Sequence, residues 1–443
     1  MSHSDLSQPA QVKTAQTKTA QTKTAQAIAY LRTPQAIRDR CGRLFELACQ
    51  DKLQHFRCNL SRLEPTADYV LQVIRENYPD LNVPFHSRWR HFGAGGRDRT
   101  ALLTQKLTGL DPLEQARTKF DLVILSVLLD AGAGAQWRYV EPDTGEMFQR
   151  SEGLAVASFH SFCQGTFAKF SQPDLGSQQA LRVDAIALKA LTADALADSF
   201  QVSADNPLVG LPGRLDLLHR LGQTLERHPQ FFGADQPRPG GLVDYLVQQA
   251  VDGQLAAPQV LQAVLLGLGE IWAGRVALDG VNLGDVWAHS ALLDAAGRDP
   301  DEVPGADLVP FHKLSQWLTY SLLEPLQELG LTITHLDQLT GLAEYRNGGL
   351  CVDLGLLEPK YAEITQVPHL PSSEVIVEWR ALTVILLDRI ADTLRQSLQL
   401  DAQTLPLVKI LEGGTWVAGR KIAAEQRPGG VPPIQIESDG TVF

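Results

Sequence analysis

The sequence has few cysteines, and they follow no pairing pattern. Its five cysteines are an odd number, and no two are spaced as CxxC, so neither a disulfide framework nor a zinc ribbon is predicted. Cys163 and Cys351 stand in apolar stretches and are expected to be reduced core residues. The 11 histidines show no close metal-ligand spacing. We therefore expect no bound metal and no other cofactor.

Long hydrophobic runs and an excess of positive charge are also missing. No apolar run reaches the roughly 18 to 20 residues that cross a bilayer, and the N-terminus has no hydrophobic core of a signal peptide. The 39 lysines and arginines are outnumbered by 51 aspartates and glutamates, which gives a net charge of -12. A general nucleic-acid binder needs a basic surface instead. The sequence therefore predicts a cytoplasmic protein that acts on a small molecule, without a membrane or nucleic-acid partner.

Several catalytic signatures are absent as well. The chain has no GxSxG elbow, no HExxH helix, no GxGxxG after a strand and no GxxxxGK[ST] loop. These absences argue against a triad hydrolase, a zinc enzyme, a nicotinamide enzyme and a P-loop phosphate binder.

What the sequence does contain is a helical pattern over most of its length. With 44% hydrophobic and 20% charged residues it has the composition of an ordinary globular protein. Apolar residues recur at spacings of three and four, and no long polar linker interrupts them. Helices are predicted at 27–31, 34–51, 65–77, 120–130, 154–170, 178–199, 213–227, 240–251, 257–268, 311–328 and 374–398. We therefore predict a mainly α fold in which residues 27–443 form a single large helical domain.

Two segments depart from this helical pattern. Residues 1–26 carry the five-residue repeat Lys-Thr-Ala-Gln-Thr, which starts at Lys13 and again at Lys18. Because this segment lacks apolar periodicity, it is predicted to be a disordered tail. Residues 137–153 have the pattern of two brief strands around a Pro-Asp-Thr-Gly turn, which predicts a short β-hairpin.

Charged residues inside apolar stretches are the first candidates for a functional site. The block LTGLAEYR at 339–346 contains Glu344 and Arg346, and the block EVIVEWRA at 374–381 contains Glu378 and Arg380. Burying a charge costs folding free energy unless an opposite charge or hydrogen bonds compensate it, so such residues often have a functional role.

Glu374 and Glu378 lie one helical turn apart and repel each other unless a cation or a proton intervenes. That cation would come from Arg380, Arg346 or Lys313. Two interpretations stay open: a structural salt bridge between the two blocks, or a network that holds one carboxylate free for catalysis.

The segment 84–99 concentrates basic side chains, aromatic residues and three glycines in an otherwise acidic protein. Glycines let backbone amides approach a ligand, and arginines bind phosphate or carboxylate through a planar fork. The segment is either an anion site or a solvated basic loop paired with surface acids. The candidate ligands that we single out in it are Arg88, Arg90, His91, Arg97 and Arg99.

Two further segments place polar residues beside apolar ones. Asp130 follows a buried run and precedes Ala-Gly-Ala-Gly, so it either contacts a substrate or caps the amides of a turn. Trp137 can offer a stacking face. His312 and Lys313 begin the helix 311–328, where they either contact a ligand or are solvated.

In these blocks the sequence resembles a family labelled as a domain of unknown function and associated with the uracil-catabolism (URC) pathway of fungi and bacteria. The resemblance spans about residues 80 to 443. The blocks that carry it are VPFHSRWRHFGAGGRDR, SVLLDAGAGAQWRY, RSEGLAVASF, PFHKLSQWLTYSLLEP, LTGLAEYRNGGL, EVIVEWRALTV, LEGGTWVAGR and PPIQIESDGTVF.

A more distant resemblance is to the queuosine-salvage N-glycosidases, helical proteins similar in fold to DNA glycosylases. Their ADYR, EIRA and FYK motifs match residues 343–346, 377–381 and 311–313 here. Glu344 replaces the aspartate of ADYR. The acid expected in the FYK helix falls near Ser321, so this part of the acid-base equipment is either absent or supplied by Asp130 or Glu324.

These resemblances imply a metal-independent N-glycosidase that hydrolyses a uracil-breakdown intermediate such as ribosylurea or its 5'-phosphate. Glu344 would act near the anomeric carbon, where an oxocarbenium-like charge develops. Arg346, Glu378 and Arg380 would hold Glu344, Asp130 would bind the ribose hydroxyls or assist, and the arginines of 84–99 would receive a phosphate. The alternative is a non-catalytic ligand-binding or scaffold subunit that channels an intermediate to a partner enzyme of the pathway.

Overall fold

The computed structural model describes residues 21–130, 132–169, 181–272, 275–296 and 303–437. Within them the chain is mainly helical, with strands only in short pairs, so the predicted mainly α fold is confirmed. Residues 21–31 are helical, so this helix already includes the end of the segment assigned to the tail. The repeats that begin at Lys13 and Lys18 fall outside the described residues, apart from the last two residues of the second.

The described α-helices after residue 31 are bounded as follows. They are α2 (Pro34–Cys49), α3 (Leu63–Asn77), α4 (Arg88–His91), α5 (Arg99–Lys106), α6 (Pro112–Leu128), α7 (Arg150–Cys163), α8 (Ala185–Ala190), α9 (Ala193–Ser199), α10 (Leu211–Arg227), α11 (Pro229–Phe232), α12 (Leu242–Gln249), α13 (Ala257–Leu268), α14 (Ala291–Ala296), α15 (Lys313–Glu328), α16 (Tyr345–Asp353), α17 (Glu363–Gln366), α18 (Glu374–Leu398), α19 (Leu407–Ile410) and α20 (Trp416–Gln426).

The strands form two-stranded pairs. The predicted hairpin is present as β2 (Tyr139–Val140) and β3 (Met147–Phe148). The other pairs join β1 (Phe56–Cys58) to β10 (Leu357–Pro359), β4 (Gln254–Ala256) to β9 (Thr332–Thr334), β5 (Ala277–Leu278) to β6 (Val281–Asn282), and β7 (Val286–Ala288) to β8 (Leu308–Pro310). Only β4 and β9 run parallel.

Local sequence explains where the core helices begin and end. Asp111 accepts hydrogen bonds from two amides at the start of α6, and Pro112 occupies its first turn, a favourable helix start. The apolar run that follows is buried throughout, and α6 ends just before Asp130. The single helix predicted at 178–199 is instead, in its described part, α8 and α9, because Thr192 caps a new helix after an extended Leu191.

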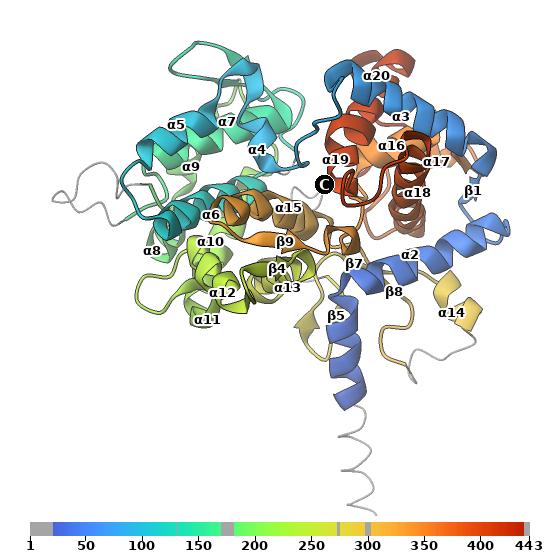
Figure 1. Cartoon of the computed structure of the whole chain (residues 1–443), viewed down its shortest axis with the longest axis horizontal. Helices are drawn as coiled ribbons and strands as arrows, with labels where there is room; N and C mark the ends of the chain where they lie inside the picture. Colours follow the sequence, from blue (N-terminus) through green and yellow to red (C-terminus); the bar gives the residue numbers. More distant parts are fainter. Residues whose placement is uncertain (1–20, 131, 170–180, 273–274, 297–302, 438–443) are drawn as a thin grey trace, which may run out of the picture.

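The two ends of the chain pack together. In Figure 1, α2 and α3 lie beside the C-terminal helices α16 to α20, α5 to α13 form the other side, and α15 lies between the two groups. The long helix α18 is buried along most of its length and packs against α2, α3 and α16. Each fully buried Leu or Ile in such a core contributes about 1.5 to 3 kcal/mol. Residues far apart in sequence therefore meet around α15.

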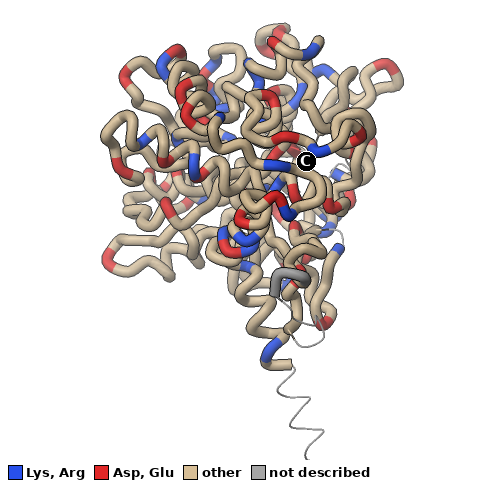
Figure 2. Tube along the Cα trace, turned by 90° about the vertical axis from the view of Figure 1, so that its right-hand side faces the viewer, with Lys and Arg blue, Asp and Glu red and all other residues tan. Residues whose placement is uncertain are grey.

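Along the Cα trace in Figure 2, positions of Lys and Arg alternate with positions of Asp and Glu in every part of the fold that is coloured. Within the described part of the chain, no helix is both long and apolar enough to cross a membrane.

Candidate active site

A cavity of about 420 Å³ lies where the two groups of helices meet α15. Its wall comes from the end of α6, the start of α7, the starts of α15, α16 and α20, and the segment 429–436. Five of the lining side chains carry a carboxylate, an ammonium or a guanidinium group: Asp130, Arg150, Lys313, Glu344 and Arg346. The structure thus brings Glu344 and Asp130 to one site, together with three of the predicted binding residues, His91, Lys313 and Arg346.

Glu344 is fixed by the helix that it begins. It adopts an extended backbone conformation at the N-cap of α16, and its side chain accepts hydrogen bonds of 2.7 Å from the amides of Arg346 and Asn347. Burial raises the pKa of Glu344, against the lowering effects of the Lys313 charge and of the two amides. The carboxylate is therefore held in one orientation at the cavity wall.

Lys313 is the first residue of α15 and supplies a cation near both acids. No described carboxylate lies within ion-pair distance of its ammonium, which stands 6.0 Å from the centre of the Trp317 ring. Burial lowers the pKa of Lys313, while the charges of Glu344 and Asp130 act to raise it. A lysine with a lowered pKa releases a proton more readily than an exposed one.

Asp130 forms an ion pair with Arg88, which does not line the cavity. The Arg88 guanidinium is fully buried and lies 2.8 Å from a carboxylate oxygen of Asp130. The hydroxyl of Ser151 is 2.7 Å from both oxygens of the same carboxylate, and Arg88 Nε donates to the hydroxyl of Ser126. Asp130 is thus oriented on the cavity wall, and Arg88 is its partner rather than a ligand for phosphate.

Aromatic rings form the rest of the wall. His91 stands edge-on to Trp317 and Trp416, with ring centres 5.7 and 5.9 Å apart, and His86 hydrogen-bonds to Glu412 at 2.7 Å. Burial and the Arg88 charge lower the pKa of His91 to about 4, so the ring is neutral near pH 7. Apolar and aromatic walls with a few fixed polar groups are typical of small-molecule sites.

One buried ion pair outside the cavity positions two of its walls. Asp285 accepts two hydrogen bonds from Arg380, at 2.8 and 2.7 Å, and one from the amide of Lys313 at 3.0 Å. Arg380 Nε donates to the carbonyl of Ala343, the residue before Glu344. The pair therefore ties the start of α15 to the start of α16.

Comparison with known proteins agrees with the blocks noted in the sequence. Residues 30–443 match the family described as "Protein of unknown function (DUF1688)". The chain belongs to this family. It is 38% identical over 448 residues to "Uracil catabolism protein 4" of Lachancea kluyveri, which covers 94% of this chain and 99% of that protein. It is 39% identical over 427 residues to "Protein urg3" of Schizosaccharomyces pombe, with the same shares covered.

These matches confirm the family suggested by the sequence, whereas the resemblance to queuosine-salvage N-glycosidases stays a prediction. Among the described residues of this DUF1688 protein, no group of three or more His, Cys, Asp or Glu residues is arranged to hold a metal ion.

The structure shows where the basic residues of 84–99 lie. His86 and His91 line the cavity, and none of the four arginines of this segment is part of its lining. Arg90 pairs with Glu324, and Arg99 is buried against Glu141 at 2.8 Å. Arg97 lies between Glu141 and the exposed Asp143. These arginines pair with acids of the protein itself, which disfavours an anion site here. Arg88 and Arg99 are fully buried, so the segment is not a solvated loop either.

Three other predicted residues also lie outside the cavity. Trp137 is fully buried, and its indole donates to the carbonyl of Phe200, so it offers no stacking face. His312 hydrogen-bonds to the carbonyl of Leu31 at 2.8 Å. Glu378 accepts from the amides of His55 and Phe56, because β1 starts beside α18.

The two charged blocks are not joined by the salt bridge considered from the sequence. Within the described residues, Glu374 accepts a hydrogen bond from the amide of Ser290. The Nε2 atom of His289 lies 3.6 Å from a carboxylate oxygen of Glu378. The connection between the blocks is the hydrogen bond from Arg380 to the Ala343 carbonyl. Arg380 therefore fixes the backbone next to Glu344.

Sequence reasoning missed Asp285, Tyr345, Trp317 and Trp416 as parts of the site. Trp416 begins α20, a helix that the apolar pattern did not predict. Gly419 in α20 permits close packing on α16, because a Cβ there would collide with the carbonyl of Arg346. The available signal was the pair Gly413-Gly414 shortly before Trp416 in LEGGTW, one of the blocks that resemble the family.

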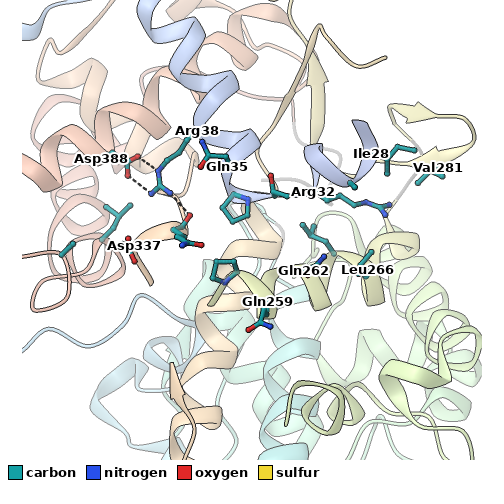
Figure 3. A pocket seen from close by; sticks show the side chains of 18 of the residues that line it. Ile28, Arg32, Gln35, Arg38, Gln259, Gln262, Leu266, Val281, Asp337 and Asp388 are labelled. Carbon is teal, nitrogen blue, oxygen red and sulfur yellow. Dashed lines mark hydrogen bonds and ion pairs between the residues drawn. The ribbon is translucent and has the colours of Figure 1, made fainter. Parts of the chain in front are cut away.

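A larger hollow of about 1150 Å³ lies between the helix 21–31, α2, α13 and α18 (Figure 3). Its described lining contains no aromatic side chain. Arg38 pairs with Asp388 there at 3.0 Å, and Asp392 pairs with Arg395. Because its arginines are largely neutralised by its own acids, this hollow is a weaker candidate for chemistry than the smaller cavity.

Proposed function

We propose that this protein is an N-ribosyl hydrolase of uracil catabolism, acting on ribosylurea or its 5'-phosphate. The observation that carries the proposal is the meeting of Glu344, Asp130 and Lys313 on one aromatic-walled cavity. The place in uracil catabolism rests on the printed name of the Lachancea kluyveri relative. A volume of about 420 Å³ suits a ligand of this size.

The proposed reaction breaks the bond between the anomeric carbon and the urea nitrogen, and water supplies the new hydroxyl. Glu344 accepts the proton of the attacking water and stabilises the positive charge on the sugar. Lys313 gives a proton to the leaving nitrogen and is later restored by the proton held on Glu344. The net change is ribosylurea plus water to ribose plus urea. Asp130 orients the ribose hydroxyls in this scheme.

Lys313 replaces the second carboxylic acid that the sequence lacked. Ser321 stands where that acid was expected, and its buried hydroxyl donates to the carbonyl of Trp317. Glu324, the other candidate, pairs with Arg90 outside the cavity. Of the groups considered, Asp130 and Lys313 are the ones beside Glu344.

The direct test is incubation of purified protein with ribosylurea and with its 5'-phosphate, followed by an assay for free urea. The proposal expects urea from at least one substrate in proportion to protein concentration. No urea from either, with folded protein and a working urea assay, contradicts it. Binding without urea release supports the ligand-carrier alternative.

The pH profile of kcat/KM should be bell-shaped. Glu344 must be ionised, and because its pKa is raised, the acid limb should have its midpoint above 4.5. Lys313 must be protonated, and because its pKa is lowered, activity should fall with rising pH below 10.5. These limbs are read from initial rates between about pH 4 and 10.

Lys313→Met sharpens this prediction. Removing the lysine charge removes an effect that lowers the pKa of Glu344, so the acid limb of the residual activity should move to higher pH and the alkaline limb should vanish. Lys421→Met, which removes a surface lysine paired with Glu76, is the control and should keep both limbs. If the acid limb does not move in Lys313→Met, the charge of Lys313 does not act on the group that titrates there, and the assignment of that limb to Glu344 is rejected.

A further inference from the structure

The charges that line the cavity do not balance. Asp130 and Glu344 are the acids, against Arg150, Lys313 and Arg346. Asp130 is already paired from outside with Arg88, and Lys313 lies in the field of Glu344. This leaves two arginines without a carboxylate partner among the described residues.

Arg346 is the more informative of the two because it is buried. Only 8% of the surface of Arg346 is exposed to solvent. One guanidinium nitrogen donates to the carbonyl of Gly430 at 2.8 Å, and the guanidinium carbon lies 5.0 Å from the centre of the Tyr345 ring. A carbonyl and a ring face do not neutralise a full charge, and a buried charge without a counterion is costly.

Arg150 adds a second cation and a helix terminus. It begins α7, a helix of 14 residues that has no side-chain cap, so the positive end of the helix dipole lies at the cavity. Its backbone φ is 55°, a left-handed value uncommon for a residue with a side chain and frequent at functional sites.

Both arginines lie near one phenol. Burial raises the pKa of Tyr345, and the charges of Arg346 and Arg150 both act to lower it. Because Tyr345 itself lines the cavity, the two cations and the uncapped helix start gather at one part of the wall.

We propose that Arg150, Arg346 and the first turn of α7 form a subsite for a phosphate monoester. A dianionic phosphate balances two unpaired arginines, where a carboxylate would balance only one, and its oxygens match the guanidinium fork and the helix amides. Glu344 and Lys313 then act at the anomeric carbon of the same ligand. This inference rests on the proposed function for the ribosyl part of the ligand, and it selects the 5'-phosphate over the free ribosyl compound.

The test measures binding and does not need turnover. Ribose 5-phosphate, ribose and inorganic phosphate are titrated by calorimetry into the full chain and into Arg150→Gln and Arg346→Gln. Wild-type protein should bind ribose 5-phosphate at least about tenfold more tightly than ribose, and each variant should lose about tenfold or more in affinity for ribose 5-phosphate. Arg227→Gln, which removes an exposed arginine paired with Glu270, should bind as wild type.

Equal affinity for ribose and ribose 5-phosphate would overturn the subsite, as would an unchanged preference in both cavity variants. Arg150 is exposed, so its replacement tests the idea even if Arg346→Gln is unstable. Arginine-dependent binding of ribose 5-phosphate or of phosphate alone, together with no urea from ribosylurea 5'-phosphate, would support the subsite and reject the proposed function. The two ideas therefore fail separately.

Discussion

Glu344→Gln is expected to lower kcat/KM for urea release by a factor of about 10² to 10⁴, the usual contribution of a positioned acid or base. A neutral amide can neither accept the proton of water nor stabilise a positive sugar. The amide oxygen can still accept a hydrogen bond from the start of α16, so the fold should survive. Partial loss of the cap should cost about 1 kcal/mol in free energy of unfolding, which thermal denaturation will report.

Glu378→Gln is the matched control for this experiment. Glu378 is also a buried glutamate that accepts hydrogen bonds from two backbone amides, but it does not line the cavity. Its replacement should lower stability and leave kcat/KM close to the wild-type value. Equal activity losses in both variants, or a loss in Glu344→Gln that merely follows unfolding, would assign Glu344 a structural role only.

Asp285→Asn is expected to lower the free energy of unfolding by about 3 to 5 kcal/mol, the cost of leaving one half of a buried pair without its partner. The substitution removes the carboxylate that accepts two hydrogen bonds from Arg380, a side chain in a residue that is 2% exposed. It also weakens the link between Lys313 and Ala343. Chemical denaturation measures the effect.

Asp388→Asn provides the comparison for Asp285→Asn. Asp388 forms an ion pair with Arg38 in which both side chains keep about a quarter of their exposure, 25% and 27%. Such a pair contributes about 0 to 1 kcal/mol. If the two substitutions cost the same free energy, Asp285 does not anchor the site as described.

The contribution of Asp285 also has a defined pH dependence. Burial by itself raises its pKa, but the charge and hydrogen bonds of Arg380 outweigh burial and hold the pKa well below 3.8. The stabilisation is therefore complete above the unfolded-state value near 3.8 and is lost as the pH falls from there toward the folded-state value. The difference in unfolding free energy between wild type and Asp285→Asn should accordingly shrink in acid.

The two candidate acids of the cavity could be found from the sequence because they interrupt apolar runs. Asp130 follows the buried α6, and Glu344 follows the buried residues Leu342 and Ala343, so both charges needed an explanation. Asp285 gave no such signal. It is one acid in a short Gly-Asp loop, and its partner Arg380 lies 95 residues away in the chain.

The basic segment 84–99 gave a strong signal in the sequence, but its arginines do not form one site in the fold. Its arginines are close in sequence but diverge in space, toward Asp130, Glu324 and Glu141. Charge density along the chain is compatible with one anion site, whereas the fold directs these arginines to acids at three separate places. Arg150, which stands alone in sequence after the hairpin, is left without an acidic partner among the described residues.

The central claim is that Glu344, Lys313 and Asp130 cleave a bond between ribose and a urea nitrogen. It is tested most directly by ¹³C NMR of ribosylurea 5'-phosphate labelled at the anomeric and urea carbons, incubated with wild-type protein. The account predicts that signals of free urea and free ribose 5-phosphate grow together in equal amounts, and that they do not grow with Glu344→Gln. An unchanged spectrum with folded wild-type protein, or loss of the urea carbon while nitrogen stays on the sugar, would contradict it.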